Sequence, residues 1–232
     1  MNLQGKTATV FGATGFVGRY VVARLAKAGA TVRVITRHRQ SAYFLRTNGV
    51  VGQIVPVSST YRSAAEIERD VAGSDLVVNC LGILAEGRGA KFTHVHTSIP
   101  EWIAQACTAH AIKSFVHVSA LGADTAKSHY AKSKLAGEQA VLRAYPAATI
   151  LRPSVIFGPE DNFFNMFAGM ARFAPALPLI GGGKTKFQPV YVGDVATAVV
   201  AALTDTQARG KIFELGGPEI LTFKEIYQRL FA

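Results

Sequence analysis

The sequence contains few cysteines, no zinc-like cluster of ligands and no long uninterrupted apolar run. Cys80 and Cys107 are the only cysteines among 232 residues, and both have apolar neighbours, which predicts two buried thiols rather than a disulfide. The cysteines and histidines lack the spacing of a zinc site, so no metal site is expected. No stretch reaches the ~18 uncharged residues that indicate a membrane span. Hydrophobic residues make up 49% of the chain, which is enough for one sizeable core.

Acidic residues are missing from the first quarter of the chain. The first is Glu66, and nine lysines and arginines precede it, so this quarter carries nearly all of the net charge of +10. Such a positive field either only keeps the surface soluble or attracts an anion: a phosphorylated cofactor, an anionic membrane surface, an acidic protein or nucleic acid. Nucleic acid ranks last, because no nucleic-acid-binding motif accompanies the charge. No charged and then apolar leader follows Met1, which predicts no secretory signal.

Short β-branched runs alternate with amphipathic stretches along most of the chain. The runs are almost continuously apolar, as expected for parallel strands that are buried on both faces. Repeated β-α-β units predict an α/β fold with a Rossmann-like, doubly wound parallel sheet. The expected strands are Thr7–Phe11, Thr31–Thr36, Gly52–Val57, Leu76–Leu81, Phe115–Ser119 and Thr149–Leu151, and the expected helices are Val17–Ala28, Ala64–Val71, Glu101–Ala111 and Lys132–Ala144.

The pattern changes after Pro153. We expect residues 1–157 to form the Rossmann core and residues 158–232 to form a small C-terminal substrate or partner region, interleaved with the core. The last helix reaches the end of the sequence without a stop signal, so we expect a truncated C-terminal region. The expected elements are helices at Asn162–Phe173, Val195–Leu203 and Phe223–Phe231, strands at Phe187–Val192 and Lys211–Leu215, and an irregular loop at 175–183.

Three glycines follow the first expected strand with the spacing G-x-x-G-x-x-G. Gly12 would allow the sharp turn off the strand, Gly15 would let backbone N–H groups approach a diphosphate, and Gly18 would let the helix pack closely on the strand. A strand, a glycine turn and a helix in this order predict a dinucleotide site. Its expected contacts are Gly12, Thr14, Gly15, Phe16, Val17 and Gly18.

The end of the second expected strand distinguishes between two cofactors. NAD sites commonly place an acid there to hold the ribose 2′-hydroxyl, but the segment Thr36–Arg39 has none. The guanidinium of Arg37 suits a 2′-phosphate, and Arg39 is placed to assist. The sequence therefore favours NADP(H), with NAD(H) as the weaker possibility and a solvated arginine pair as the structural alternative.

A tyrosine and a lysine stand four residues apart further along the chain. Tyr130 and Lys134 would share one helix face, where the ammonium would lower the pKa of the phenol and make it a general acid or base. Lys134 could also reach the nicotinamide ribose. At the end of the fourth strand, Leu81, Gly82 and Ile83 are expected to line the adenosine side of the cleft.

Together these motifs resemble the extended short-chain dehydrogenase/reductase superfamily. The resemblance rests on the glycine triplet, the Tyr130 and Lys134 pair and the segment Leu151–Pro159, and it spans essentially the whole chain. It implies that the segment after the sixth strand contacts the nicotinamide, and that a Ser or Thr and often an Asn act with the Tyr and Lys. Beyond the turn and the arginines, the expected cofactor contacts are Leu81, Gly82, Ile83, Val118, Ser119, Tyr130, Lys134, Pro153, Val155 and Ile156.

Two positions depart from this superfamily pattern. Leu121 stands where the catalytic Ser or Thr is expected, with Ser119 two residues too early, and His96 stands where Asn is usual. Loss of one polarising donor typically costs ~10²–10³ in rate. The departures argue against dehydrogenase or epimerase chemistry, which would make Tyr130 and Lys134 vestigial catalytic residues, but they leave cofactor binding untouched.

A longer segment narrows the resemblance. Gly158–Arg172 and Pro178–Asp194 are similar to the atypical short-chain dehydrogenase group that contains the nucleotide-binding accessory subunit of respiratory complex I. This resemblance implies tightly held NADPH, a structural role and complex I subunits as partners. Bacterial relatives begin without a presequence, as this chain does, so we expect a bacterial cytoplasmic protein, peripheral at the inner membrane.

Three functions remain open at this point. The first is an NADP(H)-binding accessory or stability factor of complex I with little or no turnover, whose positive charge and apolar segment Phe163–Met170 would meet a partner or an anionic lipid surface. The second is an active NADP-dependent reductase or epimerase that uses Tyr130 and Lys134. The third is a sensor of the NADP(H) ratio. The sequence names no small-molecule substrate.

Overall fold

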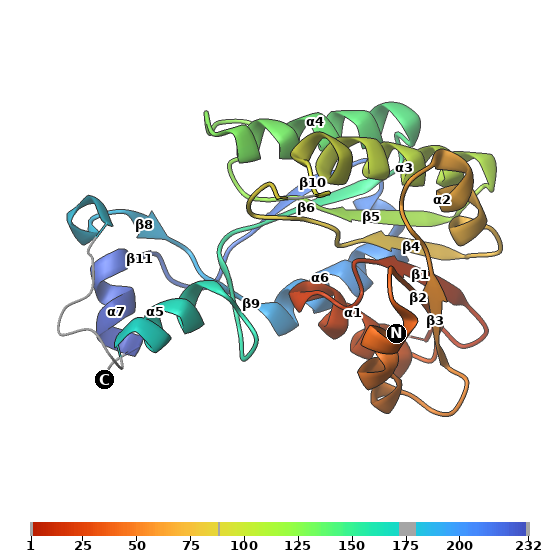
Figure 1. Cartoon of the computed structure of the whole chain (residues 1–232), viewed down its shortest axis with the longest axis horizontal. Helices are drawn as coiled ribbons and strands as arrows, with labels where there is room; N and C mark the ends of the chain where they lie inside the picture. Colours follow the sequence, from red (N-terminus) through yellow and green to blue (C-terminus); the bar gives the residue numbers. More distant parts are fainter. Residues whose placement is uncertain (1, 88, 172–179, 231–232) are drawn as a thin grey trace.

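The centre of the molecule is a sheet of seven parallel strands (Figure 1). The computed structural model describes residues 2–87, 89–171 and 180–230. The strand order is β10-β6-β5-β4-β1-β2-β3, and it reverses between β1 and β4, as in a doubly wound fold. The expected Rossmann-like α/β fold is therefore confirmed. The strands are β1 (Thr7–Phe11), β2 (Thr31–Thr36), β3 (Ile54–Ser58), β4 (Leu76–Asn79), β5 (Ser114–Val118), β6 (Thr149–Pro153) and β10 (Ile212–Leu215).

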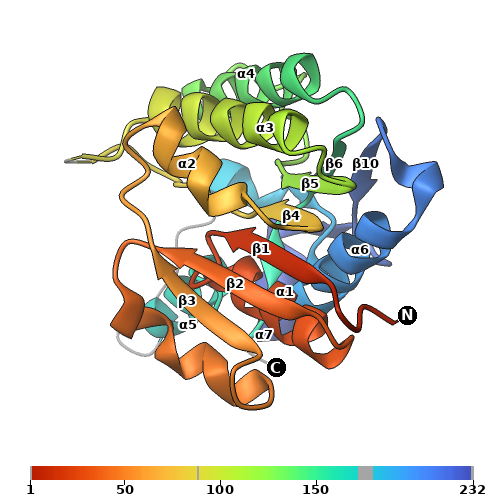
Figure 2. The same cartoon turned by 90° about the vertical axis from the view of Figure 1, so that its right-hand side faces the viewer.

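Helices cover both faces of this sheet (Figure 2). On one face lie α1 (Phe16–Lys27) and α6 (Val192–Thr204), and on the other lie α2 (Ala64–Val71), α3 (Ile99–Ala109) and α4 (His129–Ala144). Neighbouring strand residues point to opposite faces. Val116 and Val118 therefore pack on the α1 and α6 side, while Phe115 packs among α3 and α4, and each face has its own buried apolar cluster.

The C-terminal region is less regular than the sequence suggests. The strand expected at Phe187–Val192 is divided into β8 (Lys186–Phe187) and β9 (Val190–Tyr191), because Pro189 between them has no N–H to donate. A short 3-10 turn, η3 (Ile180–Gly183), replaces the described part of the expected loop. The helices there are α5 (Phe163–Ala171), α6 from Val192 and α7 (Phe223–Leu230), and residues 172–179 and 231–232 of the expected elements lie outside the described residues.

Several C-terminal elements form a lobe beside the sheet, at the left of Figure 1. In it, β8 pairs antiparallel with β11 (Leu221–Thr222), and β7 (Ile156–Phe157) pairs parallel with β9 at its border. Rings from α5, β8 and α7 fill its centre: Phe163, Phe167, Phe187, Phe223 and Tyr227. Because β10 returns to the main sheet beside β6, the chain after residue 157 contributes to both parts. The division at residue 157 stays a prediction.

A buried arginine connects four elements at one side of the sheet. Arg152 on β6 donates from Nη2 to Glu138 on α4 at 2.8 Å and from Nη1 to Asp124, in the loop after β5, at 2.6 Å. Glu214 on β10 lies 3.7 Å from the same guanidinium. The hydrogen bonds with Glu138 raise the pKa of Arg152 above its ordinary value. Each described helix is too short or too polar to cross a membrane.

Candidate functional site

The turn between β1 and α1 has no room for side chains at two of its glycines. Gly12 has a φ of +74°, and a Cβ there would lie 2.8 Å from the backbone of Cys80 and of Leu81 on the neighbouring strand end. A Cβ on Gly18 would collide with the carbonyl oxygen of Gly12, so this glycine is what lets α1 approach the turn. Gly15 is less constrained, because its Cβ would lie 3.2 Å from that oxygen. The roles expected for Gly12 and Gly18 therefore match the backbone geometry.

The N-terminus of α1 has no side-chain cap. Gly15 is its N-cap residue, no cap hydrogen bond forms there among the described residues, and the first turn of the helix has no acid. Uncapped N–H groups at a helix start attract an anion through their partial positive charge. Thr14, Phe16 and Val17 are partly buried around this helix start, and Gly15 is exposed.

Arg19 contacts this turn although it was not expected to, and the two expected arginines follow the neighbouring strand β2. Arg37 follows β2 and is exposed, with no hydrogen bond or ion pair inside the described residues, and Arg39 begins the 3-10 segment η1 (Arg39–Asn48). Arg19 on α1 donates to the carbonyl oxygens of Thr14 and Gly15 at 3.4 Å and lies 3.6 Å from Glu160. Its place one residue after Gly18 is the only sequence signal that could have pointed to it.

The end of β4 is held by a chain of hydrogen bonds. Asn79 accepts from the Leu81 N–H at 3.0 Å, and its amide donates to Nδ1 of His117 on β5 at 3.0 Å. The proton of the neutral His117 ring is then on Nε2, a buried atom that finds no partner among the described residues. Burial keeps the pKa of His117 well below its usual value. Gly82 has space for a Cβ, so sterics do not require a glycine there.

His96 lies beside Tyr130 as a neutral imidazole. It is 1% exposed and belongs to the π-helical turn η2 (Thr93–Ser98), a form that recurs at functional sites. Its Nε2 accepts from the Ile83 N–H at 3.0 Å. Its Nδ1 lies 2.8 Å from Oγ of Ser133, which donates to the Tyr130 carbonyl oxygen, so the proton is on Nδ1. Burial lowers the pKa of His96 to about 4.

Tyr130 and Lys134 both belong to α4, as expected, but they do not interact as expected. Lys134 is 3% exposed and donates from Nζ to the Val118 carbonyl oxygen at 2.9 Å. Burial lowers its pKa to about 8 and raises the pKa of Tyr130. The predicted lowering of the tyrosine pKa by Lys134 is therefore wrong, because burial sets the direction of the shift and Nζ of Lys134 binds the Val118 carbonyl oxygen instead. The Tyr130 hydroxyl makes no hydrogen bond within the described residues, and its ring packs on His96.

The ends of β5 and β6 complete the same edge. The Ser119 hydroxyl is buried without a partner among the described residues, while Leu121 is 42% exposed and donates its N–H to the Pro153 carbonyl oxygen. Val155 and Ile156 are partly buried just beyond β6. Because the carboxyl ends of β1, β4, β5 and β6 meet at one edge of a parallel sheet, the expected contacts gather there, with Arg37 following the adjacent β2.

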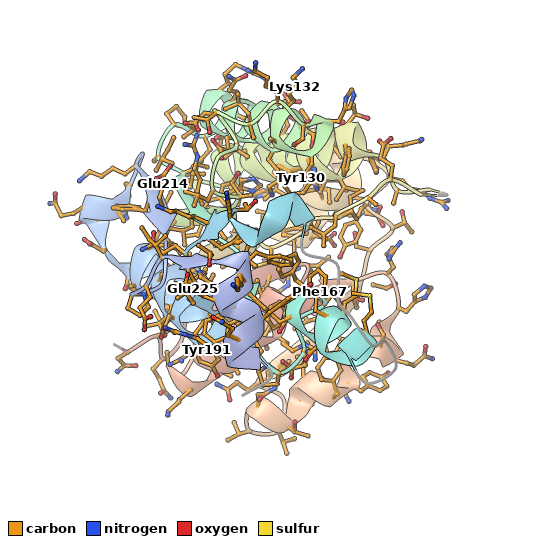
Figure 3. All side chains as sticks on the ribbon, turned by 90° about the vertical axis from the view of Figure 1, so that its left-hand side faces the viewer. Tyr130, Lys132, Phe167, Tyr191, Glu214 and Glu225 are labelled. Atoms are coloured by element: carbon orange, nitrogen blue, oxygen red, sulfur yellow. The ribbon has the colours of Figure 1, made fainter. Side chains whose placement is uncertain are left out.

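An apolar pocket of about 670 Å³ opens next to this edge, in the C-terminal lobe. It begins at Phe157, directly after Ile156, and none of the expected cofactor contacts lines it. Tyr191 lies on its wall, and the ion pair of Glu219 and Arg229 stands at its border. Figure 3 views this lobe from its outer side, with Tyr130 above it and Tyr191 below.

The chain belongs to the NAD dependent epimerase/dehydratase family, whose sequence pattern matches residues 8–216. It is 42% identical over 99% of its length to NADH dehydrogenase (ubiquinone) 1 alpha subcomplex subunit 9, a mitochondrial protein of Arabidopsis thaliana, and covers 58% of that relative. It is also 42% identical to the Mus musculus protein of the same name, over its whole length and 62% of the relative. The resemblance to the complex I subunit group is thus confirmed.

A bacterial relative and a solved structure extend this comparison. The chain is 31% identical over 83% of its length to a ceramide reductase of Caulobacter vibrioides, 59% of which it covers. UDP-glucuronic acid 4-epimerase from Bacillus cereus shares its fold, with a TM-score of 0.83 at 19% identity over 97% of this chain and 82% of the epimerase. The chain spans only 58–62% of the length of the three relatives.

The relatives correct the expected location. A bacterial cytoplasmic protein was expected because the sequence begins without a presequence. The complex I relatives from a plant, a mammal, a fungus and an amoeba all carry the word mitochondrial in their names, which contradicts that expectation. The expectation relied on the first residues of the given sequence. Those residues say nothing about the compartment in which the relatives are found.

Proposed function

We propose that this protein is an NADP(H)-binding accessory subunit or stability factor of respiratory complex I, with little or no turnover of its own. The observation that carries the proposal is the 42% identity to complex I alpha subcomplex subunit 9 over essentially the whole chain. Because the chain spans about three fifths of those relatives, its association with the complex is part of the proposal. We also keep the core of residues 1–157 and the region of residues 158–232 as its two functional parts.

The residues at the strand edge suit a dinucleotide phosphate. The uncapped start of α1 and the two sterically closed glycines provide a cradle for a diphosphate. Arg37 offers an exposed guanidinium without an ion-pair partner among the described residues, which would hold the 2′-phosphate, with Arg39 beside it. On the nicotinamide side, the orphaned hydroxyl of Ser119 gains a partner if the cofactor lies there. When bound, NADPH could supply a hydride.

The catalytic side supports the lack of turnover. Leu121 cannot donate a hydrogen bond from its side chain to a carbonyl, and both ring nitrogens of His96 are already occupied by Ile83 and Ser133. Lys134 donates to Val118, and the pKa of Tyr130 is raised rather than lowered. A substrate carbonyl at this edge would therefore meet few polarising groups.

Calorimetric titration with NADPH and NADH tests the cofactor part of the proposal. We expect tighter binding of NADPH, a smaller difference between the cofactors in Arg37→Ala, and an unchanged difference in Arg209→Ala, which removes an exposed arginine just before β10. Equal affinities of the unaltered protein would overturn the NADP(H) assignment. For the complex I part, a tagged chain should comigrate with complex I on native gels, and the full-length mouse relative is run beside it as the positive control. If the mouse relative comigrates with complex I and the tagged chain does not, the complex I part of the proposal is wrong.

A second candidate function is an NADP-dependent reductase. It is favoured by the ceramide reductase relative and by Tyr130 and Lys134 on one helix. The apolar pocket at Phe157 would suit an apolar substrate. Oxidation of NADPH with a panel of long-chain carbonyl compounds, abolished by Tyr130→Phe, would establish this function instead.

A further inference from the structure

An exposed apolar surface lies on the opposite side of the sheet from α3 and α4, at the end of the 3-10 segment η1. In a 3-10 helix, residues three apart lie above one another. Ala42 and Leu45 form the buried row and join the core with α1 and α6. The other rows present Tyr43 and Phe44, which are 43% and 46% exposed. The loop after η1 forms a tip at Val50 and Val51, which are 75% and 105% exposed. We call Tyr43, Phe44, Arg46, Val50 and Val51 the η1 face.

Cations accompany the apolar side chains of the η1 face. The Arg46 guanidinium lies 4.4 Å from the centre of the Tyr43 ring, and that of Arg19 lies 5.2 Å from the centre of the Phe44 ring. No acidic residue occurs before Glu66 in the sequence. The acid that reaches the border of the face is Glu160, 3.6 Å from Arg19. The face is therefore apolar and positively charged at once.

The tip is held in its exposed position by the fold. Oε1 of Gln53 accepts from the Val50 N–H at 3.0 Å, and Nε2 donates to the carbonyl oxygens of Ala26 on α1 and of Ala30 just before β2. Gly49 packs against this amide, and a Cβ on Gly49 would lie only 2.6 Å from Oε1 of Gln53. Val50 and Val51 are thus fixed outward, and ordering them costs little when a ligand covers them.

We propose that the η1 face docks on an anionic lipid bilayer, with the two valines entering the acyl boundary and the arginines at the level of the headgroups. A protruding tip on a protein partner needs a pocket of matching shape, whereas a bilayer accepts any apolar tip. Aromatic rings with stacked arginines suit the interface, and the acid-free first quarter supplies the attraction to anionic headgroups. The proposal goes beyond the proposed function and requires no bound nucleotide.

Vesicle co-sedimentation tests the proposal directly. The full chain should bind vesicles of phosphatidylcholine and phosphatidylserine in a two-to-one ratio, should bind pure phosphatidylcholine weakly, and should be released by raised salt. The double variant Val50→Asp, Val51→Asp should weaken binding by about tenfold or more. The matched control Leu84→Asp alters a side chain that is 77% exposed elsewhere and should bind normally.

A depth measurement distinguishes insertion from simple charge attraction. In a Trp102→Phe background, Val51→Trp should show a blue-shifted emission when anionic vesicles are added, and Leu84→Trp should not. NADPH affinity is measured on every variant, so that loss of the fold and failure of the proposed function are recognised separately. No binding to anionic vesicles, equal loss in Leu84→Asp, or binding to an acidic protein in place of vesicles would overturn the proposal.

Discussion

The two halves of the strand edge differ in how their polar groups are used. At the β1–α1 turn, the N–H groups at the start of α1 have no side-chain cap, and Arg37 has no ion-pair partner among the described residues. On the side of α4, the rings of His96 and His117 and the ammonium of Lys134 are hydrogen-bonded to the protein itself. The difference teaches that the β1–α1 turn leaves donors open to a ligand, while the protein itself engages the two histidines and the lysine on the side of α4.

The largest expected effect comes from the buried ion pair of Arg152 on β6 with Glu138 on α4. Arg152→Met removes the hydrogen-bonding partner of Glu138, which is 1% exposed, and should lower the free energy of unfolding by about 3–5 kcal/mol. Urea unfolding monitored by circular dichroism measures it. The control Glu214→Gln removes an exposed partner at 3.7 Å and should change the free energy by less than about 1 kcal/mol. If both variants lose a similarly small free energy of unfolding, the buried ion pair is not important for stability.

The second largest effect concerns the β1–α1 turn, the other half of the strand edge. Gly18→Ala places a Cβ against the Gly12 carbonyl oxygen and 2.7 Å from Ala13 Cα, so α1 must move away from the turn. We expect the Kd for NADPH to rise by about 100-fold, or about 2.7 kcal/mol. Gly169→Ala is the matched control, because this glycine lies on α5 in the C-terminal lobe and a Cβ there would meet no atom within 4 Å. If the two variants bind NADPH with equal affinity in calorimetry, the proposal that the glycine turn holds the diphosphate is wrong.

The sequence predicted the turn half better than the α4 half, for a physical reason. The roles of Gly12 and Gly18 follow from local geometry, because a strand, a turn and a helix are adjacent in the chain. The partners of His96 are Ile83 and Ser133, 13 and 37 residues away, and no spacing rule reports such a contact. The pKa of Tyr130 was predicted in the wrong direction because it follows burial, and burial depends on the packing of the whole fold.

The burial of His96 predicts a moderate loss of stability in acid. Its folded pKa of about 4 lies below the ordinary value of 6.5, so the unfolded chain binds the proton first and stability falls as the pH drops through this window. At pH 5 the loss from this group is about 2 kcal/mol. Urea unfolding at pH 7 and pH 5 should show a smaller loss in His96→Asn than in the unaltered protein. His129→Asn, which changes an exposed histidine, should keep the full loss. Identical losses in all three proteins would contradict the role of His96.

The smallest expected effect concerns Tyr130. Its hydroxyl has no hydrogen-bond partner among the described residues, while its ring packs on Phe92 and His96. Tyr130→Phe keeps the ring contacts, so the affinity for NADPH should change by less than about threefold, about 0.65 kcal/mol. Tyr130→Ala removes those contacts and should lower the thermal midpoint clearly, which shows that the assay detects damage at this position. A working general acid would lose ~10²–10⁴ in rate from the same loss of the hydroxyl. A measurable reductase rate that falls by such a factor in Tyr130→Phe would make the α4 half catalytic and remove the contrast between the two halves.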